Sequence, residues 1–231
     1  MKKPNQKLTL WAAGLVAAVI VVMAVLVAVT PTQSSPQSSG GSGQAVPETT
    51  PSAPAGCSAP TDETSNKPAP PSDLRWEASK GWTWPVSDTY GPTQHRDGLG
   101  VCFARSPLGA ALAMTTILAS FSTSPDLRSV TDQYIVDSPG KTAILAQISA
   151  PRTPQAPLAF AGYKVDSFSS DEAQITVVLK APGGSDGYIG MPTTLRWADA
   201  DWKVKLLDNG NFFAGSPTTV AAGSFTSWGA S

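Results

Sequence analysis

The sequence has few of the side chains on which reactive and metal sites depend. Its 231 residues include two cysteines and one histidine, and Asp, Glu, Lys and Arg together make up 14% of the chain. So few potential ligands argue against a zinc site and against Cys/His chemistry. The formal net charge of −1 provides no electrostatic basis for binding nucleic acid. We therefore predict no catalytic, cofactor-binding or metal-ligating residues, and no direct nucleic-acid partner.

One long apolar run, in contrast, indicates a membrane anchor. Residues Leu8–Val29 carry no charge, and a helix of this length crosses a hydrocarbon core of about 30 Å. Three lysines precede the run, and the next basic residue is Lys67, so the positive-inside rule places the N-terminus in the cytoplasm. The alternative is a cleaved signal peptide, whose apolar region is usually shorter, about 7–15 residues. We expect a single-pass protein of the cell membrane, with a cytoplasmic tip (1–7), a transmembrane helix (8–29) and an extracytoplasmic remainder.

The next segment, residues 30–71, has the composition of a disordered linker. It is rich in Pro, Ser, Thr and Gly, and Val46 is its only large aliphatic residue. Such a segment cannot bury enough apolar surface to offset its chain entropy. Ala55-Gly56-Cys57 looks like the end of a lipobox, but it lies far beyond the apolar run, so we do not expect lipidation. Residues 72–231 remain as one extracytoplasmic domain of ordinary size.

Three Ser-Pro pairs in the first half of this domain predict three helix starts. Serine favours the N-cap and proline the first helical position. The predicted helices cover about residues 107–121, 125–136 and 140–148. The first is apolar on every side, which is typical of a buried helix. At about 15 residues it is too short for a second membrane span.

The second half of the domain changes to the period of β-strands. We predict strands at 158–168 and 173–180, and a second hairpin from 188–197 and 202–207. In the strand over 173–180, Ile175, Val177 and Leu179 alternate with polar residues, as in a strand buried on one face. The aromatic residues of the tail from Asp208 are predicted to dock onto the rest of the domain. Helices followed by consecutive antiparallel strands predict an α+β domain, with about three helices packed on a curved antiparallel sheet.

Several short motifs resemble those of a known group of proteins. The run Gly100–Ala113 resembles a motif of actinobacterial membrane-anchored proteins of conjugative and integrative elements. Those proteins look similar overall: a basic tip, one span, a Pro/Ser linker, a helix start of the form Phe-Ala-x-Ser/Thr-Pro-x-Gly-Ala, and a closing hairpin. The matching residues here are Trp84-Pro85, Ser87, Gly91-Pro92, Phe103-Ala104, Pro107, Gly109-Ala110, Leu195-Arg196-Trp197 and Asp201-Trp202-Lys203-Val204.

The closing hairpin is also similar to the outer domains of bitopic type IV secretion core proteins. Those domains have a cystatin-like fold of the nuclear transport factor 2 superfamily. The two resemblances imply a nuclear transport factor 2-like domain in a non-enzymatic scaffold subunit of a conjugative or type IV secretion-like transfer complex. Its partners would be other subunits of that complex, and it could also form a homo-oligomer.

Other motifs are better explained without chemistry. Gly140-Lys141-Thr142 imitates the end of a P-loop but lacks the earlier glycine, and Ser138 with Lys141 fits Ser-x-x-Lys without its companion motifs. His95 lies in a polar stretch typical of solvated surface. Asp199 and Asp201 fit a hairpin turn better than a calcium site, which needs six to eight oxygens. Most of the tryptophans occupy positions expected of a core rather than of a sugar-binding surface.

Cys57 and Cys102 are the residues that we single out. Both lie in the part of the chain predicted to be outside the cytoplasm, where disulfides persist. A bridge between them would close a loop of about 45 residues and contribute roughly 3–4 kcal/mol by chain-entropy arithmetic. The alternative is two separate thiols, with Cys102 buried as a small apolar side chain. We favour the disulfide.

Two other functions remain open beside the scaffold. The first is a membrane-tethered binding module for a cell-wall polymer or a small lipophilic ligand, which would use the pocket that this fold often has. The second is an enzyme of the same fold, which needs acid or base side chains pointing into that pocket. None of the strand residues that we predict to point inward is a carboxylate or a histidine, so the enzyme is the least favoured.

Overall fold

The computed structural model describes residues 57, 59–61, 68–149, 156–181 and 187–229. By its internal contacts the chain divides into two units, Met1–Ser52 and Ala53–Ser231, and all described residues belong to the second. No helix in this part of the chain is long and apolar enough to cross a membrane. The predicted tip (1–7), the predicted span (8–29) and most of the predicted linker lie outside the described residues.

The three predicted helices are present. Helix α2 (Pro107–Thr123) begins where Ser106 accepts a hydrogen bond from the backbone N–H of Gly109 at 3.0 Å. Helix α4 (Pro139–Gln147) begins in the same way, with Ser138 as its N-cap. In both helices proline occupies the first turn, where no N–H is needed. The first and third Ser-Pro pairs therefore mark helix starts, as predicted.

The second Ser-Pro pair does not start a helix, and that prediction is wrong. Helix α3 (Leu127–Tyr134) begins two residues later, because the side chain of Asp126 accepts the N–H of Ser129 and acts as the N-cap. Ser124 instead ends α2, donating its backbone N–H to Ser120. Its hydroxyl oxygen also accepts the N–H of Asp126, and this closes the short connection between the two helices.

Six of the strands form one antiparallel sheet. Its order is β10-β5-β6-β7-β8, and β9 pairs with the first part of β7. Because β8 pairs with the last part of β7, the long strand β7 is bordered by two short strands along one edge. The strands are β5 (Phe160–Phe168), β6 (Glu172–Lys180), β7 (Tyr188–Ala198), β8 (Asp201–Val204), β9 (Thr218–Val220) and β10 (Thr226–Ser227).

Two hairpins precede the helices. The sequence alone suggests an extended segment or irregular strand over residues 72–87 and a loop over residues 90–98. The hairpins consist of β1 (Leu74–Ser79) with β2 (Trp82–Ser87), and β3 (Gln94–Arg96) with β4 (Leu99–Val101). Each turns through two residues with positive φ, Lys80-Gly81 and Asp97-Gly98, as a tight hairpin turn requires. Asp-Gly is a strong hairpin signal, and the expectation of a loop at this position is corrected.

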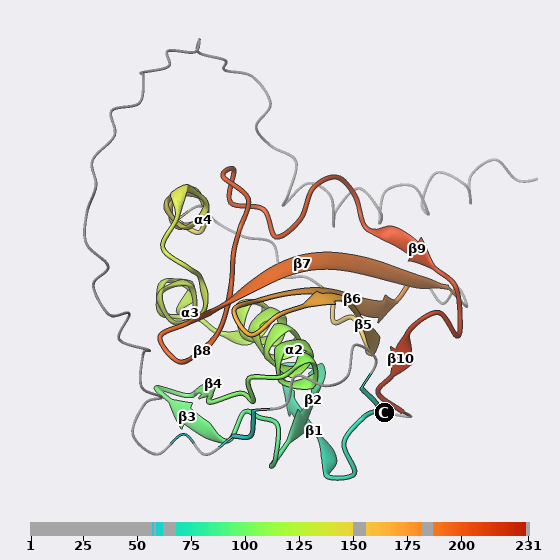
Figure 1. Ribbon diagram of the computed structural model, residues 1–231. Helices are drawn as coiled ribbons and strands as arrows, with labels where there is room; N and C mark the ends of the chain where they lie inside the picture. The colour runs from blue at the N-terminus through green and yellow to red at the C-terminus, as the bar shows by residue number, and fades with distance from the viewer. Residues whose placement is uncertain (1–56, 58, 62–67, 150–155, 182–186, 230–231) are drawn as a thin grey trace, which may run out of the picture. The chain divides into compact units, whose positions relative to one another are not determined.

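Helix α2 is the centre of the domain. Figure 1 shows it between the sheet, which arches over it, and the β1–β2 hairpin on its other side. Thirteen of its residues are buried, which confirms the prediction of a helix enclosed on all sides. With three helices and antiparallel sheets, the domain has the predicted α+β class.

The burial of β6 differs from the prediction. We expected one buried face, but every residue from Ile175 to Leu179 is buried, with Thr176 only 7% exposed and Val178 fully covered. The chain after β8 turns back along the sheet, so that Val220 of β9 lies over Gly190 next to Thr176. Near the β10–β5 edge of the sheet, the ring of Trp228 packs on that of Tyr163, with centroids 4.2 Å apart. The tail therefore completes the core, as its aromatic residues suggested.

Gly109 provides a test of how closely α2 approaches the chain before it. A Cβ atom at this position would lie 2.0 Å from the carbonyl oxygen of Ala104, and rigid backbone cannot yield as a side chain does. We expect Gly109→Ala to lower the free energy of unfolding by about 3 kcal/mol or more, measured by urea denaturation. Gly187→Ala is the matched control, because its Cβ would meet its nearest neighbour at 3.6 Å. Equal stability of the two variants would contradict this account of α2.

Candidate functional site

A short segment before α2, residues 100–104, connects most parts of the domain through its backbone. We call it the junction segment. The carbonyl of Gly100 accepts the Tyr134 hydroxyl at 2.9 Å, and the carbonyl of Cys102 accepts the Thr93 hydroxyl at 3.1 Å. The Ala104 carbonyl accepts the indole N–H of Trp202 at 2.9 Å. Helix α3, strand β8 and the β2–β3 connection are thereby joined at one place.

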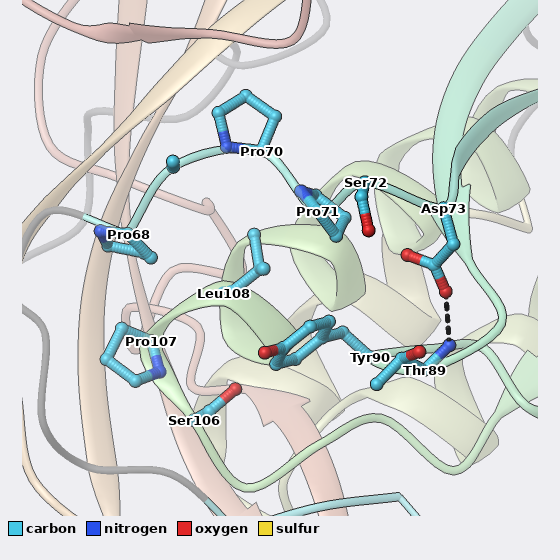
Figure 2. Close-up of a pocket in the computed structure, with 11 residues that line it drawn as sticks. Pro68, Pro70, Pro71, Ser72, Asp73, Thr89, Tyr90, Ser106, Pro107 and Leu108 are labelled. Atoms are coloured by element: carbon cyan, nitrogen blue, oxygen red, sulfur yellow. Dashed lines mark hydrogen bonds between the residues drawn. The ribbon is translucent and has the colours of Figure 1, made fainter.

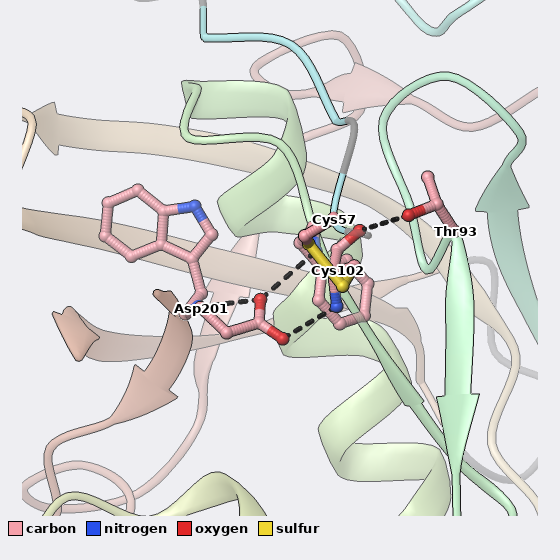
Figure 3. The surroundings of a disulfide bond; sticks show 6 residues. Cys57, Thr93, Cys102 and Asp201 are labelled. Carbon is pink, nitrogen blue, oxygen red and sulfur yellow. Dashed lines mark hydrogen bonds between the residues drawn. A yellow bond between two sulfur atoms is a disulfide. The ribbon is translucent and has the colours of Figure 1, made fainter. Parts of the chain in front are cut away.

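The carboxylate of Asp201 is the buried charged group of this junction. It accepts the backbone N–H of Cys102 at 2.8 Å, that of Phe103 at 3.1 Å, and that of its own neighbour Trp202 at 2.9 Å. Figure 3 shows the carboxylate between β8 and the junction segment. Cys102 has φ of +65°, a conformation that is costly for a residue with a Cβ atom. The two bonds from consecutive N–H groups to Asp201 help to hold it there.

This position corrects the interpretation of Asp201 from the sequence. Asp199 and Ala200 form the turn of the β7–β8 hairpin, both with positive φ, whereas Asp201 is the first residue of β8 and is 7% exposed. The domain therefore does hold an inward-pointing carboxylate. Burial raises the pKa of Asp201, and the three N–H donors offset this only in part.

Cys57 and Cys102 form a disulfide, with their Cα atoms 5.5 Å apart. The bridge attaches a residue of the predicted linker to the junction segment, beside Asp201 (Figure 3). Other described linker residues also contact the domain. Thr61 forms a β-bridge with Arg105, and the carbonyl of Pro68 accepts the hydroxyl of Tyr163 at 2.6 Å.

The two motifs that carry the family resemblance meet at this junction. Asp201 accepts hydrogen bonds from the backbone of the junction segment, and Trp202 donates one to it. In addition, the guanidinium of Arg105 lies 5.2 Å from the ring centre of Trp197 and donates to the carbonyl of Ser170. Trp197 in turn packs edge-on against Trp202. The Phe-Ala-x-Ser-Pro helix start and the closing hairpin therefore form one contact, and their side chains are occupied with holding the fold.

A cleft of about 450 Å³ lies a short distance away, at the beginning of α2. Residues Pro68–Asp73, which we call the proline strap, form one wall, and the side chain of Tyr90 and the first turn of α2 form the other (Figure 2). Asp73 accepts hydrogen bonds from the Ser87 hydroxyl and the Thr89 N–H, each at 2.8 Å. Burial raises the pKa of Asp73, but these hydrogen bonds outweigh it and hold the pKa below its ordinary value.

A smaller cavity of about 230 Å³ lies beside the disulfide. It has charged groups of both signs, and Lys203 in it forms an ion pair with Asp199. The cavity is lined by Arg96, Val101, Cys102, Gln133, Asp199, Asp201 and Lys203.

The remaining sequence candidates lie apart from both cavities. His95 is exposed on β3. Ser138 caps α4, and Lys141 forms ion pairs with Asp137 at 2.8 Å and Asp132 at 3.5 Å, which explains both of the motifs that imitate active sites. Among the described residues, no group of three or more His, Cys, Asp or Glu could hold a metal ion. The described tryptophans are buried or pack against the core.

The role of Asp201 in the junction leads to a stability prediction. Asp201→Ala leaves the N–H groups of Cys102 and Phe103 buried without an acceptor, at a cost of about 1–3 kcal/mol each. We expect the free energy of unfolding at neutral pH to fall by about 2–6 kcal/mol, measured by urea denaturation. The matched control is Asp208→Ala, an exposed aspartate after β8, for which we expect a change within about 0.5 kcal/mol.

The raised pKa of Asp201 gives this effect a pH dependence. A carboxyl group whose pKa is higher in the folded state holds its proton more tightly there, so its contribution to stability falls as pH rises. The stability of the wild type relative to Asp201→Asn, which cannot ionise, should therefore decrease as pH rises from about 3.8 through the folded pKa. A difference that stays constant or increases over this range would contradict the assignment.

The disulfide should stabilise the domain by restricting the unfolded chain. We expect Cys57→Ser to lower the free energy of unfolding by about 2–4 kcal/mol, as for other loops of this size. Wild-type protein in dithiothreitol should lose the same amount, and the reductant should have no further effect on the variant. A variant as stable as the oxidised wild type would show that the bridge contributes nothing.

Comparison with known proteins provides a family but no function. No curated protein and no solved structure matches the chain. One family profile, described as a domain of unknown function (DUF8175), matches residues 36–228. The match covers the junction segment, both hairpins, the helices, the sheet and the proline strap, together with a large part of the predicted linker. The chain belongs to the DUF8175 family.

Proposed function

We propose that this protein is a non-enzymatic, membrane-anchored scaffold subunit of a conjugative or type IV secretion-like transfer complex. Its outer domain mediates assembly with other subunits, and also with further copies of itself. Residues 8–29 anchor it in the cell membrane, with the N-terminus in the cytoplasm and the domain outside.

The observation that carries this proposal is the joining of the two resemblance motifs at the junction segment. Asp201 and Trp202 bind the backbone of residues 102–104, and Gly109 is required by the close approach of α2 to Ala104. From these contacts we infer that the motif residues serve to hold the fold, as a scaffold subunit requires.

Two further features support the proposal. The order of elements, three helices followed by a four-stranded antiparallel meander around the longest helix, agrees with the nuclear transport factor 2-like fold that the resemblance implies, and we infer that fold here. The Cys57–Cys102 disulfide is consistent with a domain outside the cytoplasm, where such bonds persist.

The test is crosslinking in the native membrane, followed by purification and mass spectrometry. We expect a photoreactive side chain at Gln174, exposed on β6, to capture transfer ATPases, channel subunits or a second copy of the chain. The same group at Arg128, exposed on α3, reports whether capture is specific to the sheet. Normal transfer after deletion of the gene from a transfer-competent element would contradict the proposal.

A second candidate function is a membrane-tethered binding module for a cell-wall polymer or a small lipophilic ligand. The cleft beneath the proline strap favours it, because its walls combine apolar rings with hydroxyl and carboxylate groups, as small-molecule sites do. In that case crosslinking should recover wall material or the protein alone, and a ligand should raise the thermal stability of the protein.

A further inference from the structure

We propose that the cleft beneath the proline strap binds a neutral saccharide, which contacts the ring of Tyr90. This inference names a site and a ligand class for the second candidate function, on which it rests. It does not depend on the scaffold proposal, so either proposal can be disproved without affecting the other. The cleft differs from the pocket expected inside the fold, because its walls are the strap and the first turn of α2.

The charge of the lining excludes one large class of ligands. Among the eleven lining residues there is no Lys, Arg or His, and Asp73 is the only charged side chain. The hydrogen bonds from Ser87 and Thr89 hold Asp73 as a carboxylate at neutral pH. A phosphate, a carboxylate or an anionic polymer would therefore meet a negative group without a compensating cation.

The strap side of the cleft carries hydrogen-bond acceptors with capacity left for a ligand. Its prolines provide carbonyl oxygens but no N–H groups, although the carbonyls of Pro68 and Pro71 already accept the Tyr163 hydroxyl and the Leu74 N–H. An ionised carboxylate accepts about four hydrogen bonds, of which Asp73 uses those from Ser87 and Thr89. A ligand that fills the cleft should therefore bring donors. Hydroxyl groups of a sugar satisfy this condition, whereas a purely lipophilic ligand would leave the acceptors buried without partners, which is costly.

The other wall provides an aromatic ring and hydroxyl groups. Tyr90 is half-buried, and in Figure 2 its hydroxyl and that of Ser106 turn toward the same part of the cleft. Ser106 lines the cleft but is 1% exposed and accepts the N–H of Gly109, so the hydroxyl of the half-buried Tyr90 is the more accessible of the two. Flat apolar rings beside hydroxyl groups suit a pyranose, which has C–H groups on its faces and hydroxyl groups at its edge.

The proposal is tested on the full chain in detergent micelles by saturation-transfer NMR. Two neutral probes, chitotetraose and maltotetraose, are compared with tetramethylammonium, a cation that would also suit Asp73. Tyr90→Ala removes the ring, Tyr90→Leu retains apolar volume, and Tyr90→Phe removes only the hydroxyl. Tyr188→Ala is the matched control, since Tyr188 packs on Phe225 and is not among the residues that line the cleft.

We expect transfer to at least one tetrasaccharide, with a Kd that increases about tenfold or more in Tyr90→Ala and Tyr90→Leu. Tyr90→Phe and Tyr188→Ala should remain within about threefold of the wild type. Absence of transfer to both tetrasaccharides would overturn the proposal. So would binding that both ring-removing variants leave unchanged, or displacement of the sugar by tetramethylammonium at lower concentration. These binding measurements involve no transfer subunit, so they do not test the assembly proposal, which the crosslinking experiment tests.

Discussion

The carboxylate of Asp201 is the group on which the arrangement of this domain depends. It accepts two consecutive backbone N–H groups, those of Cys102 and Phe103, from a segment about a hundred residues earlier in the chain. These bonds hold Cys102 in a left-handed conformation, and that turn directs the chain from β4 toward the start of α2. The next residue, Trp202, fixes the Ala104 carbonyl, against which Gly109 packs. The last hairpin of the sheet therefore positions the central helix.

The junction segment is also where the predicted linker is attached to the domain, through the disulfide. Cys102 is held by Asp201 on its N–H and by Thr93 on its carbonyl, so the disulfide attaches Cys57 to one of the best-fixed points of the backbone. Thr61 and Pro68 provide further contacts along the same segment. The proline strap is held at both ends, at Pro68 by the Tyr163 hydroxyl and at Asp73 by the Ser87 hydroxyl and the Thr89 N–H. The cleft beneath it is part of the folded unit.

Local sequence signals predicted the structure correctly where a residue type has one usual structural role. Ser106 and Ser138 cap helices because their hydroxyls accept an N–H of the first turn, and the proline that follows has no N–H that needs a partner there. The apolar composition of α2 predicted its burial. The pairing of the two cysteines was predicted from their expected extracytoplasmic location, and the structure contains the bond. The signal fails at Ser124, where Asp126 is the better-placed cap, and at Asp97-Gly98, where a short hairpin signal lay within a stretch too polar to suggest strands.

The candidate site was harder to predict, because its residues acquire their roles only through distant contacts. An aspartate after Asp199-Ala200 looks like a third turn residue, and nothing local shows that two N–H groups from another segment will enclose it. Similarly, Val178 and Thr176 look half-exposed until the chain after β8 covers them. Tyr90 and the prolines of the strap are separated by a complete hairpin and carry no motif. A binding surface assembled from a linker and a helix start becomes visible only once the disulfide and the Tyr163 hydroxyl have fixed the linker in place. The family match includes Cys57 and the proline strap, so this part of the apparent linker belongs to the domain.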